Sequence, residues 1–207
     1  MGWRSLLHNP RLDDNRIVSP AALEAILRDT HAIGFAMASE AKTGTLLKAL
    51  AASKPAGRIL ELGTGTGVGT AWLLAGMDPD ARLDSVDNDP AAQDIARRHL
   101  GHDPRVTFHL ADGAGFLRRL FPRTIDLVYA DTWAGKFSDL DAALALVRAG
   151  GIYLVDDLLP QPNWPEGHAA KIPVLINDLE SRAGFTAVTL AWASGLLILV
   201  RAGTGSD

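Results

Sequence analysis

The sequence predicts an α/β fold built on a mostly parallel, doubly wound sheet, and three features of its 207 residues support this. Short apolar runs typical of buried strands alternate with segments of helical periodicity along most of the chain. Residues 58–70 place one such run directly before a glycine-rich turn and an apolar helix. Two strand-like segments joined by a short turn close the chain, as in a terminal hairpin.

Length and composition indicate one globular domain over residues 1–207, with an arm and helices over 1–55 and an α/β core over 56–207. The hydrophobic fraction of 47% and the charged fraction of 21% exclude a disordered class. The net charge of −4 gives no electrostatic reason to expect nucleic acid, and the absence of cysteine excludes disulfides. The longest apolar run, 195–200, is too short to cross a membrane, so we expect a cytoplasmic protein.

The N-terminal part predicts two helices. Residues 1–18 show no periodicity and are expected to form an arm or a subunit contact. Ser19 and Pro20 are typical of an N-cap and a first helical position, and apolar residues then recur at helical spacing over 22–27. The second helix is expected over 39–52, because Pro55 follows.

A glycine-rich loop organises the rest of the chain. Strand residues 59–62 lead directly into four alternate glycines, and a helix is expected over 68–75; the glycines are Gly63, Gly65, Gly67 and Gly69. Glycine permits positive φ and lets the backbone approach a ligand at the helix N-terminus. The loop therefore predicts a ligand lying across the end of this strand.

The glycine spacing excludes two common ligands. A dinucleotide fingerprint needs Gly-x-Gly-x-x-Gly or Ala, and Val68 and Thr70 stand where that last small residue is required. A phosphate-binding P-loop ends in Gly-Lys-Ser/Thr, and no lysine occurs between Lys54 and Lys136. Nicotinamide dinucleotides and nucleoside triphosphates are therefore not expected.

The next two strands also end in aspartates. Residues 82–86 predict a strand that ends at Asp87, and Asp89 and Pro90 cap and open the helix after it. Asp87 follows Gly63 by 24 residues, close to the ~20 typical of an acidic residue that binds ribose hydroxyls. A third strand, 106–110, is followed by Asp112, a candidate cap for a helix over 114–120. The arginines around that helix are expected to be solvated rather than to bind RNA.

Three more carboxylates follow the fourth and fifth strands. The strand predicted over 125–130 ends at Asp131, and the strand over 151–155 ends at Asp156 and Asp157. Carboxyl ends of neighbouring parallel strands meet at the ligand-binding edge of such a sheet. Because like charges raise one another's pKa, we expect either a divalent cation there or one protonated carboxyl group.

The C-terminal part predicts a loop, a helix and a hairpin. The proline-rich residues 158–168 are expected to form a lid or acceptor wall, shaped by Asn163, Trp164 and His168, with His168 starting the next helix. That helix is expected over 169–183. Strands over 185–191 and 196–200, joined by residues 193–195, complete the fold.

These residues carry a resemblance to a known family. Residues 61–67, Glu-Leu-Gly-Thr-Gly-Thr-Gly, resemble the first motif of class I S-adenosylmethionine-dependent methyltransferases. Further matches from Phe35 to the C-terminus resemble the catechol and caffeoyl-CoA O-methyltransferases. The resemblance implies a Rossmann-like, seven-stranded sheet of order 3-2-1-4-5-7-6 with an antiparallel last strand and helices on both faces. It also implies S-adenosylmethionine as cofactor and a homodimer.

The resemblance assigns cofactor contacts along the whole carboxyl edge. Residues before the second helix cover the methionine end, the glycine loop follows the cofactor, and the next strand tips hold the ribose and adenine. The implied contacts are Met37, Ser39, Glu61, Gly63, Thr64, Gly65, Gly69, Asp87, Asn88, Asp112, Gly113, Asp131 and Trp133.

The resemblance also implies a metal and a base. Family members bind magnesium through Asp, Asp and Asn, which match Asp131, Asp156 and Asp157, so Asp157 replaces the usual Asn. Oxygen ligands of this kind suit Mg, Mn or Ca. The family lysine falls at Ala134; Lys136, two residues later, is either the substitute base or a surface lysine. Asp131 and Lys136 are the candidate catalytic residues.

The function that follows is methyl transfer from S-adenosylmethionine to a hydroxyl group of a small aromatic molecule, assisted by a divalent metal. Two alternatives stay open. The chain is a metal-independent methyltransferase acting on another small molecule, or it is an S-adenosylmethionine-binding module without catalysis.

Overall fold

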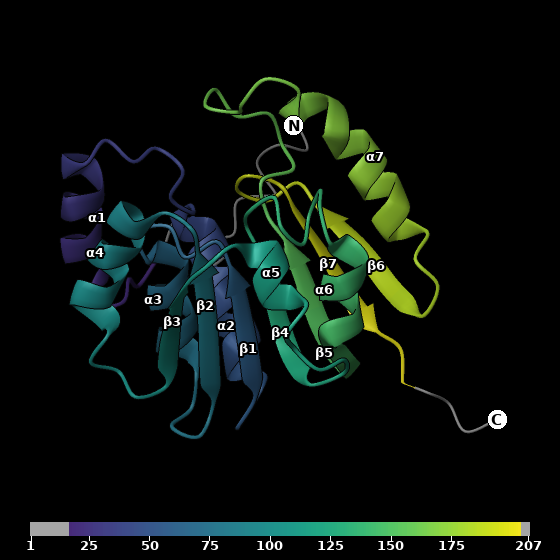
Figure 1. Ribbon diagram of the computed structural model, residues 1–207, viewed down its shortest axis with the longest axis horizontal. Coiled ribbons are helices and arrows are strands. Elements are labelled where there is room, and N and C mark those ends of the chain that lie inside the picture. The colour runs from purple at the N-terminus through teal and green to yellow at the C-terminus, as the bar shows by residue number, and fades with distance from the viewer. Residues whose placement is uncertain (1–16, 204–207) are drawn as a thin grey trace, which may run out of the picture.

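The computed structural model describes residues 17–203, and their strands form one seven-stranded sheet (Figure 1). The order β3-β2-β1-β4-β5-β7-β6 confirms the predicted one. The strands are β1 (Arg58–Leu62), β2 (Arg82–Asp87), β3 (Val106–Leu110), β4 (Ile125–Ala130), β5 (Val147–Val155), β6 (Phe185–Leu190) and β7 (Leu196–Arg201). The first five pair in parallel, while β7 runs antiparallel to both β5 and β6. Residues 1–16 of the predicted arm lie outside the described part.

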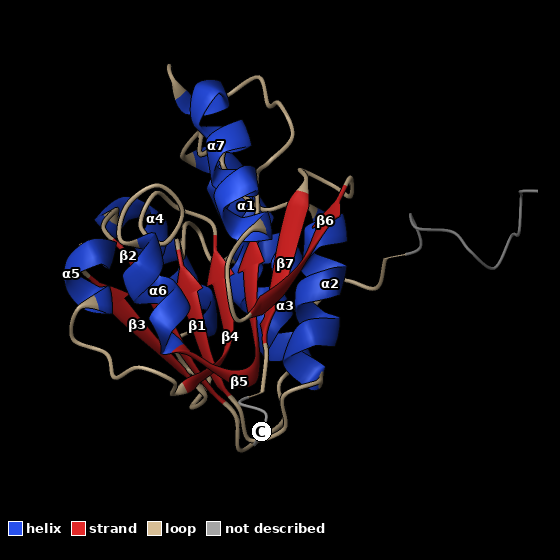
Figure 2. Cartoon of the chain, turned by 90° about the vertical axis from the view of Figure 1, so that its right-hand side faces the viewer, coloured by secondary structure: helices blue, strands red, loops and turns tan. Residues whose placement is uncertain are grey.

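Helices cover both faces of the sheet (Figure 2). They are α1 (Leu23–Ala32), α2 (Ala41–Ala52), α3 (Val68–Gly76), α4 (Pro90–Leu100), α5 (Gly113–Leu117), α6 (Leu140–Leu146) and α7 (His168–Glu180). Because side chains alternate along a strand, Ile59 packs in the core under α1 to α4 and Leu60 packs in the core under α5 to α7. None of the helices in the described range combines the length and apolar character that spanning a membrane requires.

Local signals misplaced some helix boundaries. The helix expected to begin at Ser19 and Pro20 begins instead at Leu23, after a turn in which the Pro20 carbonyl accepts a bond from the Leu23 amide at 3.0 Å. Helix α5 is shorter than predicted and ends at Leu117. Helix α6 was not predicted; it has seven residues and follows Asp139, which has a left-handed φ of 51°.

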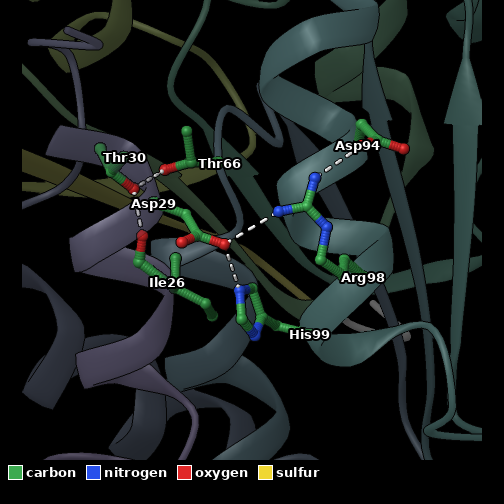
Figure 3. Close-up of polar contacts among 7 residues, drawn as sticks. All are labelled: Ile26, Asp29, Thr30, Thr66, Asp94, Arg98 and His99. Atoms are coloured by element: carbon green, nitrogen blue, oxygen red, sulfur yellow. Dashed lines mark hydrogen bonds and ion pairs between the residues drawn. The ribbon is translucent and has the colours of Figure 1, made fainter. Parts of the chain in front are cut away.

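Helix α1 is attached to both α4 and the glycine loop (Figure 3). Asp29 Oδ2 accepts hydrogen bonds from Arg98 at 3.0 Å and from His99 at 2.8 Å. The Thr30 hydroxyl donates to the Ile26 carbonyl at 2.7 Å and lies 2.8 Å from Thr66 Oγ1. These contacts fix the end of α1 beside the loop, so that residues 33–39, which follow α1, pass over the strand end.

Candidate active site

Two neighbouring hollows open at the carboxyl edge of the sheet. The larger has a volume of about 560 Å³, within the roughly 300–1,000 Å³ typical of small-molecule sites, and the smaller has about 140 Å³. Both are lined by Gly63, Asp87, Asn88, Thr132 and Trp133, so they adjoin along the β1 and β2 ends. The larger continues to Asp131 and Lys136, and the smaller to Asp112 and Gly113.

The glycine loop has positive φ angles, which are strained for residues other than glycine. Gly63 has a φ of 100° and Gly67 a φ of 93°. A Cβ atom on Gly63 would lie 2.9 Å from the Asp131 carbonyl oxygen, and one on Gly67 would lie 2.7 Å from the Ala96 Cβ. The loop therefore needs glycine at both positions to pack against β4 and α4.

Asp87 is held by the loop at the edge of both hollows. Its Oδ2 accepts a hydrogen bond from the Gly65 amide at 2.7 Å, and its Oδ1 accepts one from the Asp89 amide at 2.9 Å. An ionised carboxylate has about four acceptor positions. One backbone bond per oxygen orients the group and leaves acceptor positions for two ligand hydroxyls.

The smaller hollow combines a capping aspartate with an aromatic wall. Asp112 Oδ2 accepts from the Gly115 amide at 2.7 Å, so it caps α5 as expected while it also lines the hollow. Trp133 also lines this hollow, with 43% of its surface exposed, and Lys171 Nζ lies 4.7 Å from its ring centre. This hollow can take a flat ring with hydrogen-bonding edges.

Glu61 lies behind the loop, and its direct contact with a cofactor stays a prediction. The side chain is fully buried and lines neither hollow. Its Oε2 accepts from the hydroxyls of Thr70 at 2.5 Å and Ser85 at 2.6 Å, while Oε1 has no hydrogen-bond partner in the described part of the chain. Burial raises its pKa to about 8, against the lowering effect of the two hydroxyls. Glu61 therefore supports the loop from within the core.

Asp131 and Asp156 share one tyrosine. The Tyr129 hydroxyl lies 2.7 Å from Asp156 Oδ2 and 3.1 Å from Asp131 Oδ2, and Ser39 Oγ lies 3.0 Å from it. Because a phenol has one proton, the two carboxyl groups share Tyr129 as a hydrogen-bond donor. Burial and the charge of Asp156 raise the pKa of Asp131 well above its usual range, and burial raises that of Asp156. The shared hydroxyl therefore links the two carboxyl groups.

Asp157 points to the loop that follows β5. Its φ is 63°, its Oδ1 accepts from Trp164 Nε1 at 2.6 Å, and its Oδ2 lies 3.6 Å from His168 Nε2. The His168 ring is buried and stacks on Trp164 at 4.5 Å, and neither of its nitrogens has a hydrogen-bond partner among residues 17–203. Burial, followed by the charge of Lys136, lowers the pKa of His168. Asp157 thus holds an aromatic wall of the larger hollow.

Lys136 is buried beside the carboxylates, so it is not a surface lysine. Its Nζ donates to the Asp156 carbonyl at 2.8 Å. The turn after Trp133 directs it there, because the Trp133 carbonyl accepts from the Lys136 amide at 3.1 Å and Gly135 has a φ of 86°. Bending of this loop therefore brings Lys136 to the acidic cluster.

The predicted metal ligands do not fit a divalent cation. Asp156 Oδ1 accepts from Ser194 Oγ and from the Asp157 amide, while its Oδ2 contacts Tyr129. Asp157 is bonded to Trp164. Within residues 17–203, no three His, Cys, Asp or Glu side chains are arranged to hold a metal ion. Hard cations need free anionic oxygens converging on one point, whereas both Asp156 oxygens and Asp157 Oδ1 have protein donors.

All the other predicted site residues line one or both hollows, and two segments cover the larger one. Met37 and Ser39 belong to the first segment, residues 35–40. The second is the 161–168 loop, from which Asn163 Nδ2 donates to the Ala36 carbonyl at 2.8 Å. This bond ties the two covers together across the hollow.

Sequence reasoning missed Tyr129 and Ser194. Tyr129 had a signal, since it precedes Asp131 by two residues and strand side chains two apart share a face. Ser194 had none nearby in the chain. It lies in the turn before β7, and antiparallel pairing of Leu197 with Val155 brings that turn to the end of β5.

The sheet order and the carboxyl-edge site define a class I methyltransferase fold, and comparisons agree. A family model described as a methyltransferase domain matches residues 60–158. A putative O-methyltransferase from Mycolicibacterium smegmatis is 34% identical over 145 residues, covering 68% of this chain and 69% of the relative. A catechol O-methyltransferase from Mycobacterium tuberculosis is 29% identical over 72% of this chain and 70% of its own length. The chain belongs to the S-adenosylmethionine-dependent O-methyltransferase family of the catechol and caffeoyl-CoA type.

A solved structure extends the match beyond the shared core. The crystal structure of cofactor-bound Rv0187 from MTB is 25% identical, with a TM-score of 0.77, and covers 93% of this chain and 94% of that one. The chain covers less of some other relatives. It matches 65% of the length of the putative O-methyltransferases from Mycobacterium sp. strains KMS and MCS, and 53% of the one from strain JLS.

Proposed function

We propose that this protein transfers the methyl group of S-adenosylmethionine to a hydroxyl oxygen of a small aromatic molecule. The observation that carries the proposal is the position of Asp87, which the glycine loop holds at the junction of the two hollows. The similar Rv0187 structure is cofactor-bound, which supports a bound cofactor here. The name of the M. tuberculosis relative, catechol O-methyltransferase, supports an aromatic acceptor.

In this proposal the cofactor spans both hollows. The adenine occupies the smaller hollow between Trp133 and the residues Asp112 and Gly113. The ribose hydroxyls bond to Asp87, each charge-assisted bond contributing about 1.5–3 kcal/mol. Met37 and Ser39 would hold the methionine part in the larger hollow. Bound there, the cofactor would supply a methyl group to an acceptor held beside Asp131 and Lys136.

The reaction needs alignment and removal of one proton. The acceptor oxygen forms a bond to the methyl carbon as the sulfur–carbon bond breaks, and the electron pair leaves with sulfur. A phenol of pKa near 10 costs about 4 kcal/mol to ionise at pH 7, at ~1.36 kcal/mol per pKa unit. In this proposal the Asp131 carboxylate accepts the hydroxyl proton, and the Lys136 ammonium stabilises the negative charge that develops on the oxygen.

Calorimetry with S-adenosylhomocysteine tests the cofactor site. Asp87→Ala and Asp87→Asn should each weaken binding by about tenfold or more, because tenfold corresponds to ~1.4 kcal/mol and charge-assisted bonds are lost. Asp84→Asn is the matched control, since Asp84 lies on the same strand but bonds to His109 at 2.8 Å and lines neither hollow. Unchanged affinity in both Asp87 variants would contradict the proposed cofactor site.

Transfer of a labelled methyl group to catechols tests the chemistry. Asp131→Asn should abolish turnover and retain most of the affinity for S-adenosylhomocysteine, since it keeps the shape of the side chain and removes the proton acceptor. Binding of the cofactor without transfer to a broad panel of hydroxylated acceptors would favour a non-catalytic binding module instead.

Assembly and location belong to the same proposal. The family resemblance suggests a homodimer, which light scattering coupled to size exclusion tests directly. The cytoplasmic location expected from the sequence is tested by fractionating cells that express the protein.

A further inference from the structure

We propose that the acidic cluster of this site is balanced by the Lys136 ammonium in place of a divalent cation, so that methyl transfer proceeds without metal. The inference rests on the proposed function, because it concerns the charges around the same acceptor position. It departs from the metal that the family resemblance implies.

Lys136 lines the larger hollow together with Asp131, Asp156 and Asp157. Only 4% of its surface is exposed, and its Nζ donates to the main chain of Asp156 at 2.8 Å. Its charge acts on both Asp131 and Asp156. Burying an ammonium costs several kcal/mol unless opposite charges surround it, and these carboxyl groups supply them. The lysine and the carboxyl groups therefore stabilise one another.

A turn over residues 133–136 places the lysine at this position. The Ala134 side chain lines the smaller hollow. It lies close to Gly113, where an added Cβ atom would be only 2.8 Å from the Ala134 Cβ. Gly135, with its φ of 86°, then reverses the chain direction. A lysine at 134 would therefore start toward the adenine side, whereas Lys136 lies against the Asp156 main chain at the end of β5.

Protein donors already occupy both carboxyl oxygens of Asp156 and one of Asp157. Asp156 accepts from Ser194 and from the Asp157 amide, and Tyr129 lies against its second oxygen. At position 157 the family resemblance implies an asparagine. Asp157 stands there instead, and its Oδ1 accepts a hydrogen bond from Trp164 Nε1 at 2.6 Å. A cation binding all three aspartates would have to displace these donors as well as approach the buried ammonium. Both requirements weaken metal binding.

Calorimetric titration with Mg²⁺ and Mn²⁺ tests the inference on the protein saturated with S-adenosylhomocysteine. We expect no saturable binding to the wild type below about 1 mM, the weak end of protein cation sites. Turnover with catechol as acceptor should be the same in EDTA as in Mg²⁺. A saturable one-site isotherm, or turnover that EDTA abolishes and Mg²⁺ restores, would overturn the inference.

A charge-removing variant tests the role of the lysine itself. Lys136→Met leaves the carboxylates unbalanced, so its affinity for Mn²⁺ should rise by at least about tenfold, or ~1.4 kcal/mol. Lys54→Met is the matched control, because Lys54 also donates to a backbone carbonyl, that of Gly150 at 2.9 Å, and lines neither hollow. Lys136→Arg keeps the charge and should bind Mn²⁺ as weakly as the wild type. A Lys136→Met protein with wild-type Mn²⁺ binding would overturn the assignment.

The same titrations separate this inference from the proposed function. Failure of the wild type to bind S-adenosylhomocysteine would contradict the proposed function before any metal is added. Normal cofactor binding followed by a clear Mn²⁺ isotherm would contradict the role of Lys136 alone.

Discussion

The Tyr129 hydroxyl and the Asp156 carboxylate form a hydrogen bond of 2.7 Å that joins the carboxyl ends of β4 and β5. Tyr129 is completely buried, and its hydroxyl also contacts Asp131 and Ser39. Replacing Tyr129 by Phe removes a partner from both carboxyl groups at once. We expect a loss of about 1–3 kcal/mol in the free energy of unfolding, measured by urea denaturation.

Tyr153→Phe provides the comparison for that experiment. Tyr153 is equally buried, but its hydroxyl makes a single bond, to the Gly135 carbonyl. The Tyr129 variant should therefore lose more stability than the Tyr153 variant. Equal losses would show that the contacts with the two aspartates add nothing to stability.

Glu61 makes stability depend on pH. Its folded pKa of about 8 lies above its usual value of 4.5, so the folded state favours the protonated form. The stabilisation is complete below pH 4.5 and is lost as the pH rises to about 8. The loss amounts to at most about 5 kcal/mol at ~1.36 kcal/mol per pKa unit. Glu61→Gln cannot ionise and should be free of this loss.

Urea denaturation of both proteins at about pH 5 and pH 8.5 measures the effect. The difference in unfolding free energy should shift in favour of Glu61→Gln at the higher pH. Parallel pH profiles for the two proteins would mean that Glu61 titrates normally.

Gly63→Ala should disturb the loop through both strain and contact. Its φ of 100° is unfavourable for alanine, and the added Cβ would lie 2.9 Å from the Asp131 carbonyl oxygen. We expect at least about 1–3 kcal/mol of destabilisation and weaker binding of S-adenosylhomocysteine. Gly34→Ala is the control: it shares a positive φ of 68° but has nothing within 4 Å. If both variants lose the same stability, the close approach to β4 is unimportant.

Thr30→Val tests the attachment of α1 to the glycine loop. Valine keeps the shape of the side chain but leaves the Thr66 hydroxyl without its 2.8 Å contact. We expect about 1 kcal/mol less stability and faster amide hydrogen exchange over residues 33–39, which follow α1.

Thr45→Val is the control for that variant, since the Thr45 hydroxyl bonds within its own helix region, to the Lys42 carbonyl at 2.8 Å. Its hydrogen exchange over 33–39 should match that of the wild type. Unchanged exchange in Thr30→Val would mean that α1 does not fix this segment.

The sequence carried strong information about the strand ends. The end of the Arg82–Asp87 strand at its terminal aspartate followed from a capping Asp89 and a helix-opening Pro90, both local signals. The sheet order came from the family resemblance, because periodicity does not specify which strands pair. The short α6 escaped prediction because seven residues provide too little periodicity.

Side-chain direction was harder to predict than chain path. The acidic residue before the glycines was expected at the ligand, yet alternation along β1 turns Glu61 into the core with Thr70 and Ser85. The three strand-end aspartates were expected to converge, yet the left-handed backbone of Asp157 turns its carboxylate to Trp164. Neither outcome has a signature within a few residues of sequence.

The hydrogen bond from Asn163 to the Ala36 carbonyl has a consequence for turnover. One side of this bond is anchored through α1 to the glycine loop, while the other belongs to a loop that leads into α7. Under the proposed function, the cofactor and the acceptor would lie beneath this bond, so their release would require it to break. Breaking one exposed bond costs little. Asn163→Ala should therefore change the rate of ligand release rather than the stability of the fold.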